Sequence, residues 1–149
     1  MNIKDYKKIF MSGIGGISMS GIALILKKWN FEIVGSDAVQ SKQTDLLTEN
    51  GIKVIIGQKE DNVDKTFNLF IYSAAIKENN PEYVKAKELG IMMIERGEFL
   101  GELTKLFNDK LDKGGCPYVI HLLKVYEVFV KIILRYNKYL QKYNRKNNS

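Results

Sequence analysis

A cluster of glycines near the start of the chain constrains the fold more than any other feature. Gly13-Ile14-Gly15-Gly16 comes directly after a short apolar run that ends near Met11. Beyond the cluster, apolar residues recur at helical spacing, at Met19, Ile22, Ala23, Leu26 and Trp29. The pattern predicts a strand, a tight glycine turn and a helix. In open α/β sheets, ligands bind at such turns, where the first strand ends and the first helix begins.

The next ninety residues repeat this alternation. Apolar, β-branched runs predict further strands over 31–35, 52–56, 69–72 and 91–94. Helices are predicted over 41–50, 81–89 and 97–106, with Gly51 and Gly90 ending the first two. Short apolar strands that alternate with helices form parallel sheets with both faces covered. The predicted class is therefore α/β, a Rossmann-like doubly wound parallel sheet of about five strands, followed by a C-terminal helical tail.

The net charge of +6 belongs to the C-terminal third of the chain. Residues 1–104 carry 13 basic and 14 acidic side chains, whereas residues 105–149 carry 10 basic and 3 acidic ones. The sequence pI near 9.3 therefore reflects the C-terminal third and does not indicate that the first two-thirds bind nucleic acid. No nucleic-acid partner is predicted.

Cys116 and His121 are the only residues of their types. This excludes an intramolecular disulfide or a Cys/His zinc cluster. Without a signal-peptide pattern at the N-terminus, we expect a cytoplasmic protein.

Three parts are predicted: a nucleotide-binding domain over 1–106, a polar linker over 107–118 and an apolar-basic helical tail over 119–149. Polar residues in the tail recur every three or four positions, which argues against a transmembrane span. The tail has three open interpretations: an unselected sequence after a frame disruption, a helix that packs against protein, and a helix on an anionic membrane surface.

The glycine loop is suited to a phosphate-bearing ligand. Glycines let the backbone approach a pyrophosphate, whose charge is met by the free N–H groups and the dipole of the following helix. The dinucleotide pattern G-x-G-x-x-G is incomplete, since Ser18 occupies the third glycine position. The alternative is a tight turn without a ligand.

Other candidate residues follow the ends of other strands. Asp37 lies where this fold directs an acid at a ribose hydroxyl, or else it closes a surface Asx-turn. Ser73, Ala74 and Ala75 leave room for a ligand, or else they allow close helix packing. Arg96 follows the fifth strand and could pair with a phosphate, or else it forms a solvated pair with Glu95.

Several motifs in order resemble the N-terminal domain of the Mur ligases over about residues 6–106. They are the run from Gly13 to Gly21, Gly35-Ser36-Asp37, Tyr72-Ser73-Ala74-Ala75-Ile76 and Asn80-Pro81-Glu82. The form of the glycine run is most similar to the branch that joins L-alanine to UDP-N-acetylmuramate. The resemblance implies a domain that holds the UDP part of UDP-N-acetylmuramate. The UDP-binding residues then expected are Gly13, Ile14, Gly15, Gly16, Ile17, Ser18, Ser36, Asp37, Ser73, Ala74, Ala75 and Arg96. Ser18 and Gln58 depart from the family pattern, which commonly has glycine and histidine there.

The resemblance also implies that the complete ligases use ATP and Mg²⁺ to form an acyl phosphate, which alanine then attacks. No G-x-x-x-x-G-K-[ST] phosphate loop occurs in these residues. We therefore expect this chain to bind no cofactor itself and to have no ligase turnover alone. The alternative function is a stand-alone module that binds NAD or another nucleotide, with a tail for docking to a partner or a membrane surface.

Overall fold

The computed structural model describes residues 1–112, with side chains to residue 105, and Met1–Leu106 forms a compact unit. The predicted tail at 119–149, the end of the predicted linker, Cys116 and His121 lie outside the described residues. No helix within the described part is long and apolar enough to cross a membrane.

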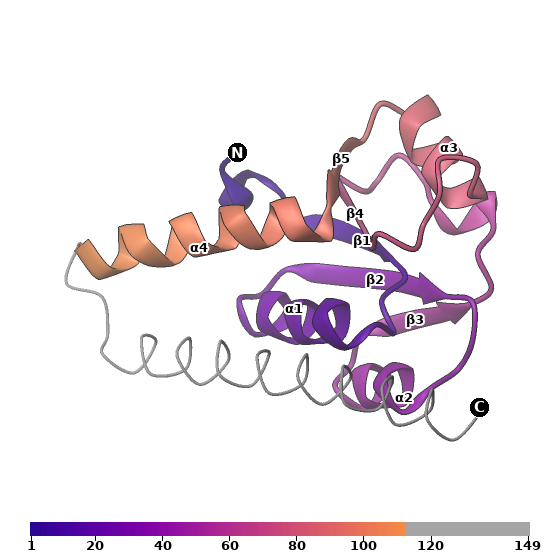
Figure 1. Cartoon of the computed structure of the whole chain (residues 1–149), viewed down its shortest axis with the longest axis horizontal. Helices are drawn as coiled ribbons and strands as arrows, with labels where there is room; N and C mark the ends of the chain where they lie inside the picture. Colours follow the sequence, from indigo (N-terminus) through magenta and orange to yellow (C-terminus); the bar gives the residue numbers. More distant parts are fainter. Residues whose placement is uncertain (113–149) are drawn as a thin grey trace, which may run out of the picture. The chain divides into compact units, whose positions relative to one another are not determined.

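Five parallel strands form one sheet (Figure 1). They are β1 (Lys8–Ser12), β2 (Glu32–Asp37), β3 (Lys53–Ile56), β4 (Leu69–Tyr72) and β5 (Met92–Glu95). Their order is β3-β2-β1-β4-β5, with the first strand in the centre. The chain adds β2 and β3 on one side of β1 and then crosses to add β4 and β5 on the other, so the strand order reverses between β1 and β4. Ligands of doubly wound sheets bind at this kind of reversal. The predicted fold class and strand number are confirmed.

The helical segments are η1 (Ile3–Asp5), α1 (Ile17–Lys28), α2 (Lys42–Glu49), η2 (Glu60–Asn62), α3 (Pro81–Glu88) and α4 (Arg96–Asp112). η1 precedes β1 and α4 follows β5, and each of the others connects two consecutive strands. Ser41 caps α2 in a reciprocal box with Thr44, and Asn80 caps α3 ahead of Pro81. Gly51 and Gly90 have φ of 77° and 67°, the left-handed conformation expected where α2 and α3 end.

The last helix is longer than predicted. The sequence indicated a helix over 97–106 and a linker from 107, but α4 continues to Asp112. Residues 102–113 contain neither glycine nor proline, so their polar composition does not interrupt the helix. The first six residues of the predicted linker are therefore helical.

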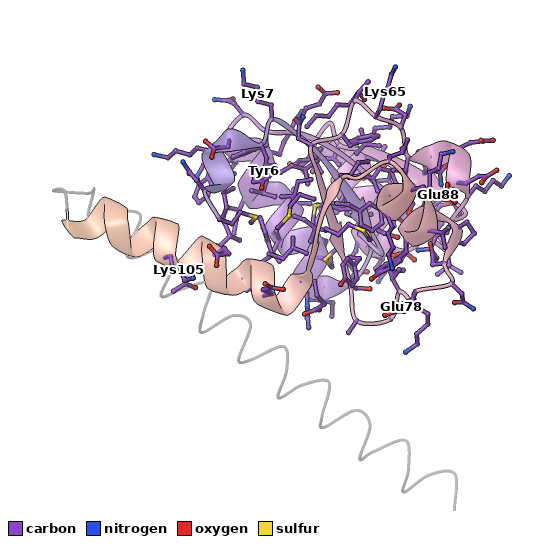
Figure 2. All side chains as sticks on the ribbon, turned by 90° about the horizontal axis from the view of Figure 1, so that it is seen from above. Tyr6, Lys7, Lys65, Glu78, Glu88 and Lys105 are labelled. Atoms are coloured by element: carbon purple, nitrogen blue, oxygen red, sulfur yellow. The ribbon has the colours of Figure 1, made fainter. Side chains whose placement is uncertain are left out.

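Side-chain alternation along the strands produces one apolar cluster on each face of the sheet. Ile9 and Met11 of β1 face a cluster that includes residues of α1, α2 and α4, whereas Phe10 faces one that includes Ala86 of α3. Phe10 stacks on Phe70 with ring centroids 5.7 Å apart, an arrangement that adds about 0.5–1.5 kcal/mol beyond burial. Charged side chains such as Lys7, Lys65 and Glu88 project outward from the domain (Figure 2).

One close approach fixes where the chain leaves β1. A Cβ at Gly35 of β2 would lie 2.5 Å from Cδ1 of Ile14 and 2.7 Å from the carbonyl oxygen of Met11. Ile14 is fully buried, so its side chain fills the space that a larger residue on β2 would need. The absence of a side chain at Gly35 thus brings the turn after β1 against β2.

Replacing this glycine tests the close approach. We expect Gly35→Ala to lower the free energy of unfolding by about 1–3 kcal/mol, because the backbone oxygen cannot move away cheaply. The control is Gly101→Ala on the exposed side of α4, where a Cβ meets no atom of the described residues within 4 Å. That change should raise stability by about 0.5–1 kcal/mol. Urea unfolding followed by circular dichroism measures both, and equal stability of the two variants would contradict the packing argument.

Candidate functional site

The glycine loop, residues 13–16, joins β1 to α1 and is bonded to the end of β2. The amides of Gly13 and Ile14 both donate to the carbonyl oxygen of Ser36, each at 2.9 Å. Gly13 has φ of 78°, a conformation that suits glycine. These two bonds and the buried Ile14 side chain hold the loop at the carboxyl edge of the sheet.

Asp37 contacts the loop from the end of β2. Its Oδ2 accepts a hydrogen bond from the amide of Gly15 at 2.9 Å, and its Oδ1 accepts one from the amide of Val39 at 3.3 Å. A Cβ at Gly15 would lie 2.8 Å from Asp37 Oδ2 and 3.0 Å from Cγ2 of Thr44. Asp37 therefore closes a local turn, as the second alternative predicted, and it also lies against the glycine loop. Its contact with a ribose hydroxyl stays a prediction.

The third segment is the Ser73 turn, residues 73–76, which follows β4. Its first amide donates to the carbonyl oxygen of Ser12 at 3.2 Å, and the amide of Ile76 donates to the carbonyl oxygen of Ser73 at 3.0 Å. A Cβ at Gly13 would lie only 2.6 Å from Ser73 Oγ, so the two turns are in close contact. Ala74 and Ala75 are exposed. The glycine loop thus lies between Asp37 and Ser73, where the strand order reverses.

The N-terminus of α1 opens on this site without a side-chain cap. Its N-cap residue is Gly16, which makes no side-chain hydrogen bond. Among the described residues, none accepts from the amides of Ile17, Ser18 and Met19, whereas the amide of Ser20 donates to Gly16. Unpaired first-turn amides and the positive end of a helix dipole attract anions. Ser18, which breaks the dinucleotide pattern, therefore contributes a backbone donor of the kind an anion needs.

Arg96 begins α4 directly after β5, and its Nε lies 3.9 Å from Oε1 of Glu95. Neither of these two buried atoms has a hydrogen-bond partner in the described part of the chain, although both side chains are about one-third exposed. Glu95 Oε2 accepts from the amide of Gly97 at 2.8 Å. On the neighbouring strand, burial raises the pKa of Tyr72, and Tyr83 beside it adds to the effect, so Tyr72 is a neutral group at physiological pH.

Ser36 is not available as a side-chain ligand in this structure. Its residue is fully buried, and its hydroxyl donates to Oε2 of Glu82 at 2.6 Å. What it offers the site is its carbonyl oxygen, which holds the glycine loop. Ile14 likewise contributes through its backbone, because its side chain is in the core. The other predicted residues lie on the glycine loop, at the start of α1, at Asp37, in the Ser73 turn and at Arg96.

The sequence reasoning assigned no role to Glu82, the second residue of α3. This fully buried carboxyl group accepts from Ser12 Oγ and Ser36 Oγ at 2.6 Å each, and from Asn62 Nδ2 at 2.7 Å. Gln58 joins the same cluster, since it accepts from Nδ2 of Asn80 at 2.9 Å. An acid just after a helix-capping Asn-Pro, together with serines on the strand face that turns toward that helix, was the available signal.

The site thus presents backbone donors from α1, a carboxylate from Asp37 and a hydroxyl from Ser73, while Arg96 follows β5, the strand paired with β4. Such a set can bind an anionic group next to a hydroxyl-bearing one. Within the described residues, no group of three or more His, Cys, Asp and Glu side chains is arranged to hold a metal ion.

Comparison with known proteins shows similarity to part of several ligases. The sequence pattern of the Mur ligase family, catalytic domain, matches residues 8–108. A UDP-N-acetylmuramate–L-alanine ligase from Agathobacter rectalis is 50% identical over 114 residues, which cover 74% of this chain and 25% of that protein. A ligase of the same name from Clostridium botulinum is 51% identical over 114 residues, covering 76% and 25%. The chain spans about a quarter of the length of these curated relatives.

The solved structures of two ligases are also similar to this chain. The UDP-N-acetylmuramate–alanine ligase of Thermotoga maritima superposes with a TM-score of 0.64 at 29% identity, over 67% of this chain and 23% of that one. The UDP-N-acetylmuramate:L-alanyl-γ-D-glutamyl-meso-diaminopimelate ligase of a Neisseria species gives 0.60 at 28% identity, over 64% and 30%. Because the family pattern covers more than half of the residues and includes every segment of the site, the chain belongs to the Mur ligase family.

Proposed function

We propose that residues 1–106 bind the UDP part of UDP-N-acetylmuramate and are the substrate-binding domain of a UDP-N-acetylmuramate–L-alanine ligase. The observation that carries this proposal is the meeting of the glycine loop, Asp37 and the Ser73 turn at the point where the strand order reverses. The match to the Mur ligase family pattern, residues 8–108, includes this same region.

The pyrophosphate is assigned to the N-terminus of α1. The unpaired amides of Ile17 and Ser18 are donors there, and the helix dipole adds positive potential. The amides of Gly13, Ile14 and Gly15 are already bonded to Ser36 and Asp37, so they shape the loop rather than bind the phosphates. Arg96, whose Nε lacks a hydrogen-bond partner in the described region, is a second donor for an anion.

The nucleoside is assigned to Asp37 and the Ser73 turn. Each oxygen of the Asp37 carboxylate accepts one amide and keeps a second acceptor position for a ribose hydroxyl. Ala74 and Ala75 are small and exposed, so a ring or a sugar can approach the backbone there. No nicotinamide is required by this arrangement, and NAD is the competing ligand against which the proposal is tested.

Ligation itself is proposed for a complete protein of the relatives' length. The acyl phosphate step uses ATP and Mg²⁺, and its reacting groups must be held together in space. For the chain of 149 residues, the proposed role is to hold the UDP-linked substrate in the cytoplasm, where nucleotide substrates occur. Neither nucleic acid nor a membrane surface has a place in this role.

Ligand identity can be tested by calorimetric titration of the full chain. We expect UDP-N-acetylmuramate to bind, UDP to compete with it, and NAD to bind at least about 10-fold more weakly, a difference of about 1.4 kcal/mol. Tighter binding of NAD, or a failure of UDP to compete, would contradict the proposed function.

A second test changes the loop. Gly13→Ala places a Cβ against Ser73 Oγ and a non-glycine residue at positive φ, a conformation that costs about 1–2 kcal/mol. We expect affinity for UDP-N-acetylmuramate to fall about 10-fold. Gly101→Ala on α4, where a Cβ meets none of the described residues within 4 Å, should leave the affinity unchanged. A Gly13→Ala protein that stays folded and binds normally would show that the loop is not the ligand site.

Turnover of the chain alone is the third test. Purified chain incubated with ATP, Mg²⁺, L-alanine and UDP-N-acetylmuramate should release phosphate at the rate measured without protein. The expectation rests on the need to position ATP phosphates and metal together with the substrate. Phosphate release well above the background rate, dependent on L-alanine, would refute it.

A further inference from the structure

Glu82 is connected to the candidate site without facing it. Its carboxyl group is fully buried at the start of α3 and accepts from Ser12 and Ser36, which end or nearly end β1 and β2. The hydroxyl group and the carbonyl oxygen of each serine bind different partners. The hydroxyls donate to Glu82, while the carbonyl oxygens accept amides of the glycine loop and the Ser73 turn.

The two serines make separate connections. Through Ser36, Glu82 is linked to the amides of Gly13 and Ile14, which the Ser36 carbonyl accepts at 2.9 Å each. Through Ser12, it is linked to the amide of Ser73, which the Ser12 carbonyl accepts at 3.2 Å. Each of the two turns is therefore connected to the same carboxyl oxygen, Oε2, by two hydrogen bonds that run through one serine.

Glu82 makes further hydrogen bonds with residues outside the two turns. Oε1 accepts from Nδ2 of Asn62 in η2, and the same nitrogen donates to the carbonyl oxygen of Gly57, the residue after β3. Its own amide is held by the Oδ1 of Asn80, the α3 cap. A buried carboxyl group with three donors is costly to disturb, because any donor or acceptor left unpaired loses its solvation without a replacement.

We infer that Glu82 is a positioning residue of the candidate site: it fixes the glycine loop through Ser36 and the Ser73 turn through Ser12, without contacting the ligand. This role rests on the proposed function for its effect on UDP-N-acetylmuramate, but not for its effect on the two turns. The carboxyl group sets the separation between the turns because one oxygen binds both serines. Its loss lets each turn move independently.

The experiment removes the three donors to Glu82 one at a time in the full chain. Ser36→Ala and Ser12→Ala each delete a hydroxyl but keep the carbonyl oxygen that holds a turn. Asn62→Ala is the matched control, because it also deletes one donor to Glu82, and within the described residues the Asn62 side chain makes no hydrogen bond to either turn. Amide hydrogen exchange is measured at Gly13, Ile14 and Ser73, relative to Phe70 in the centre of the sheet.

We expect a segment-specific result. Ser36→Ala should accelerate exchange at Gly13 and Ile14 about 10-fold, and Ser12→Ala should do so at Ser73, the scale of losing one hydrogen bond to a charged or buried partner. Asn62→Ala should change these amides no more than it changes Phe70. In titrations, the two serine variants should bind UDP-N-acetylmuramate about 10-fold more weakly than Asn62→Ala does.

Glu82→Leu, which removes the carboxyl group, completes a double-mutant cycle with Ser36→Ala. Because both changes break the same link, their combined effect on affinity should be smaller than the product of the single effects. If Glu82→Leu fails to fold, the comparison of the two serine variants with Asn62→Ala decides the matter without it.

The outcomes separate the two proposals. Exchange at the turns that is no faster in the serine variants than in Asn62→Ala overturns the positioning role, as does faster exchange with unchanged affinity. If the unaltered chain binds neither UDP-N-acetylmuramate nor UDP, the proposed function fails, and the exchange comparison alone then decides whether Glu82 fixes the turns.

Discussion

The site depends on one carbonyl oxygen, that of Ser36. Two consecutive amides of the glycine loop donate to it at 2.9 Å each. These bonds fix the path of the chain from the end of β1, past the end of β2, to the start of α1. The approach is possible because Gly35 has no side chain and Ile14 occupies the space. The positions of Asp37 and of the first turn of α1 follow from this contact. The loop is shaped by the sheet before any ligand arrives, which lowers the cost of ordering it on binding.

Most of the fold could be predicted because its elements have strong local signals. The strand at Leu69–Tyr72 was predicted with its observed bounds, and the helix predicted to begin at Pro81 does begin there. The end of α4 could not be predicted, because the polar residues of its last turns have the composition of a linker and no glycine or proline within 102–113 separates helix from linker. Where glycine, proline or a cap was present, the boundaries were close; where none was present, composition misled.

The site was predictable as backbone and not as side chains. Glycines and strand ends indicated the three turns, because strand topology alone brings them to one edge. The partner of Ser36 is 46 residues away and that of Ser12 is 70 residues away, so the Asn80-Pro81-Glu82 run does not by itself indicate which side chains Glu82 contacts. Alternation does contain part of the answer. Ser36 shares the face of Val34, toward α3, and therefore points away from the α1 side of the sheet.

The arrangement of donors and acceptors also limits the kind of ligand. The interior behind the loop is rich in acceptors already satisfied, with Glu82 taking three donors, whereas the opening of α1 is rich in unpaired amides. An anion is therefore favoured at α1 and disfavoured beside the Asp37 carboxylate, where a hydroxyl is the better partner. Inorganic phosphate satisfies only the first of these positions. A nucleoside diphosphate, with charge and sugar hydroxyls held a short distance apart, would match both positions, so the polarity of the site is complementary to that of the proposed ligand.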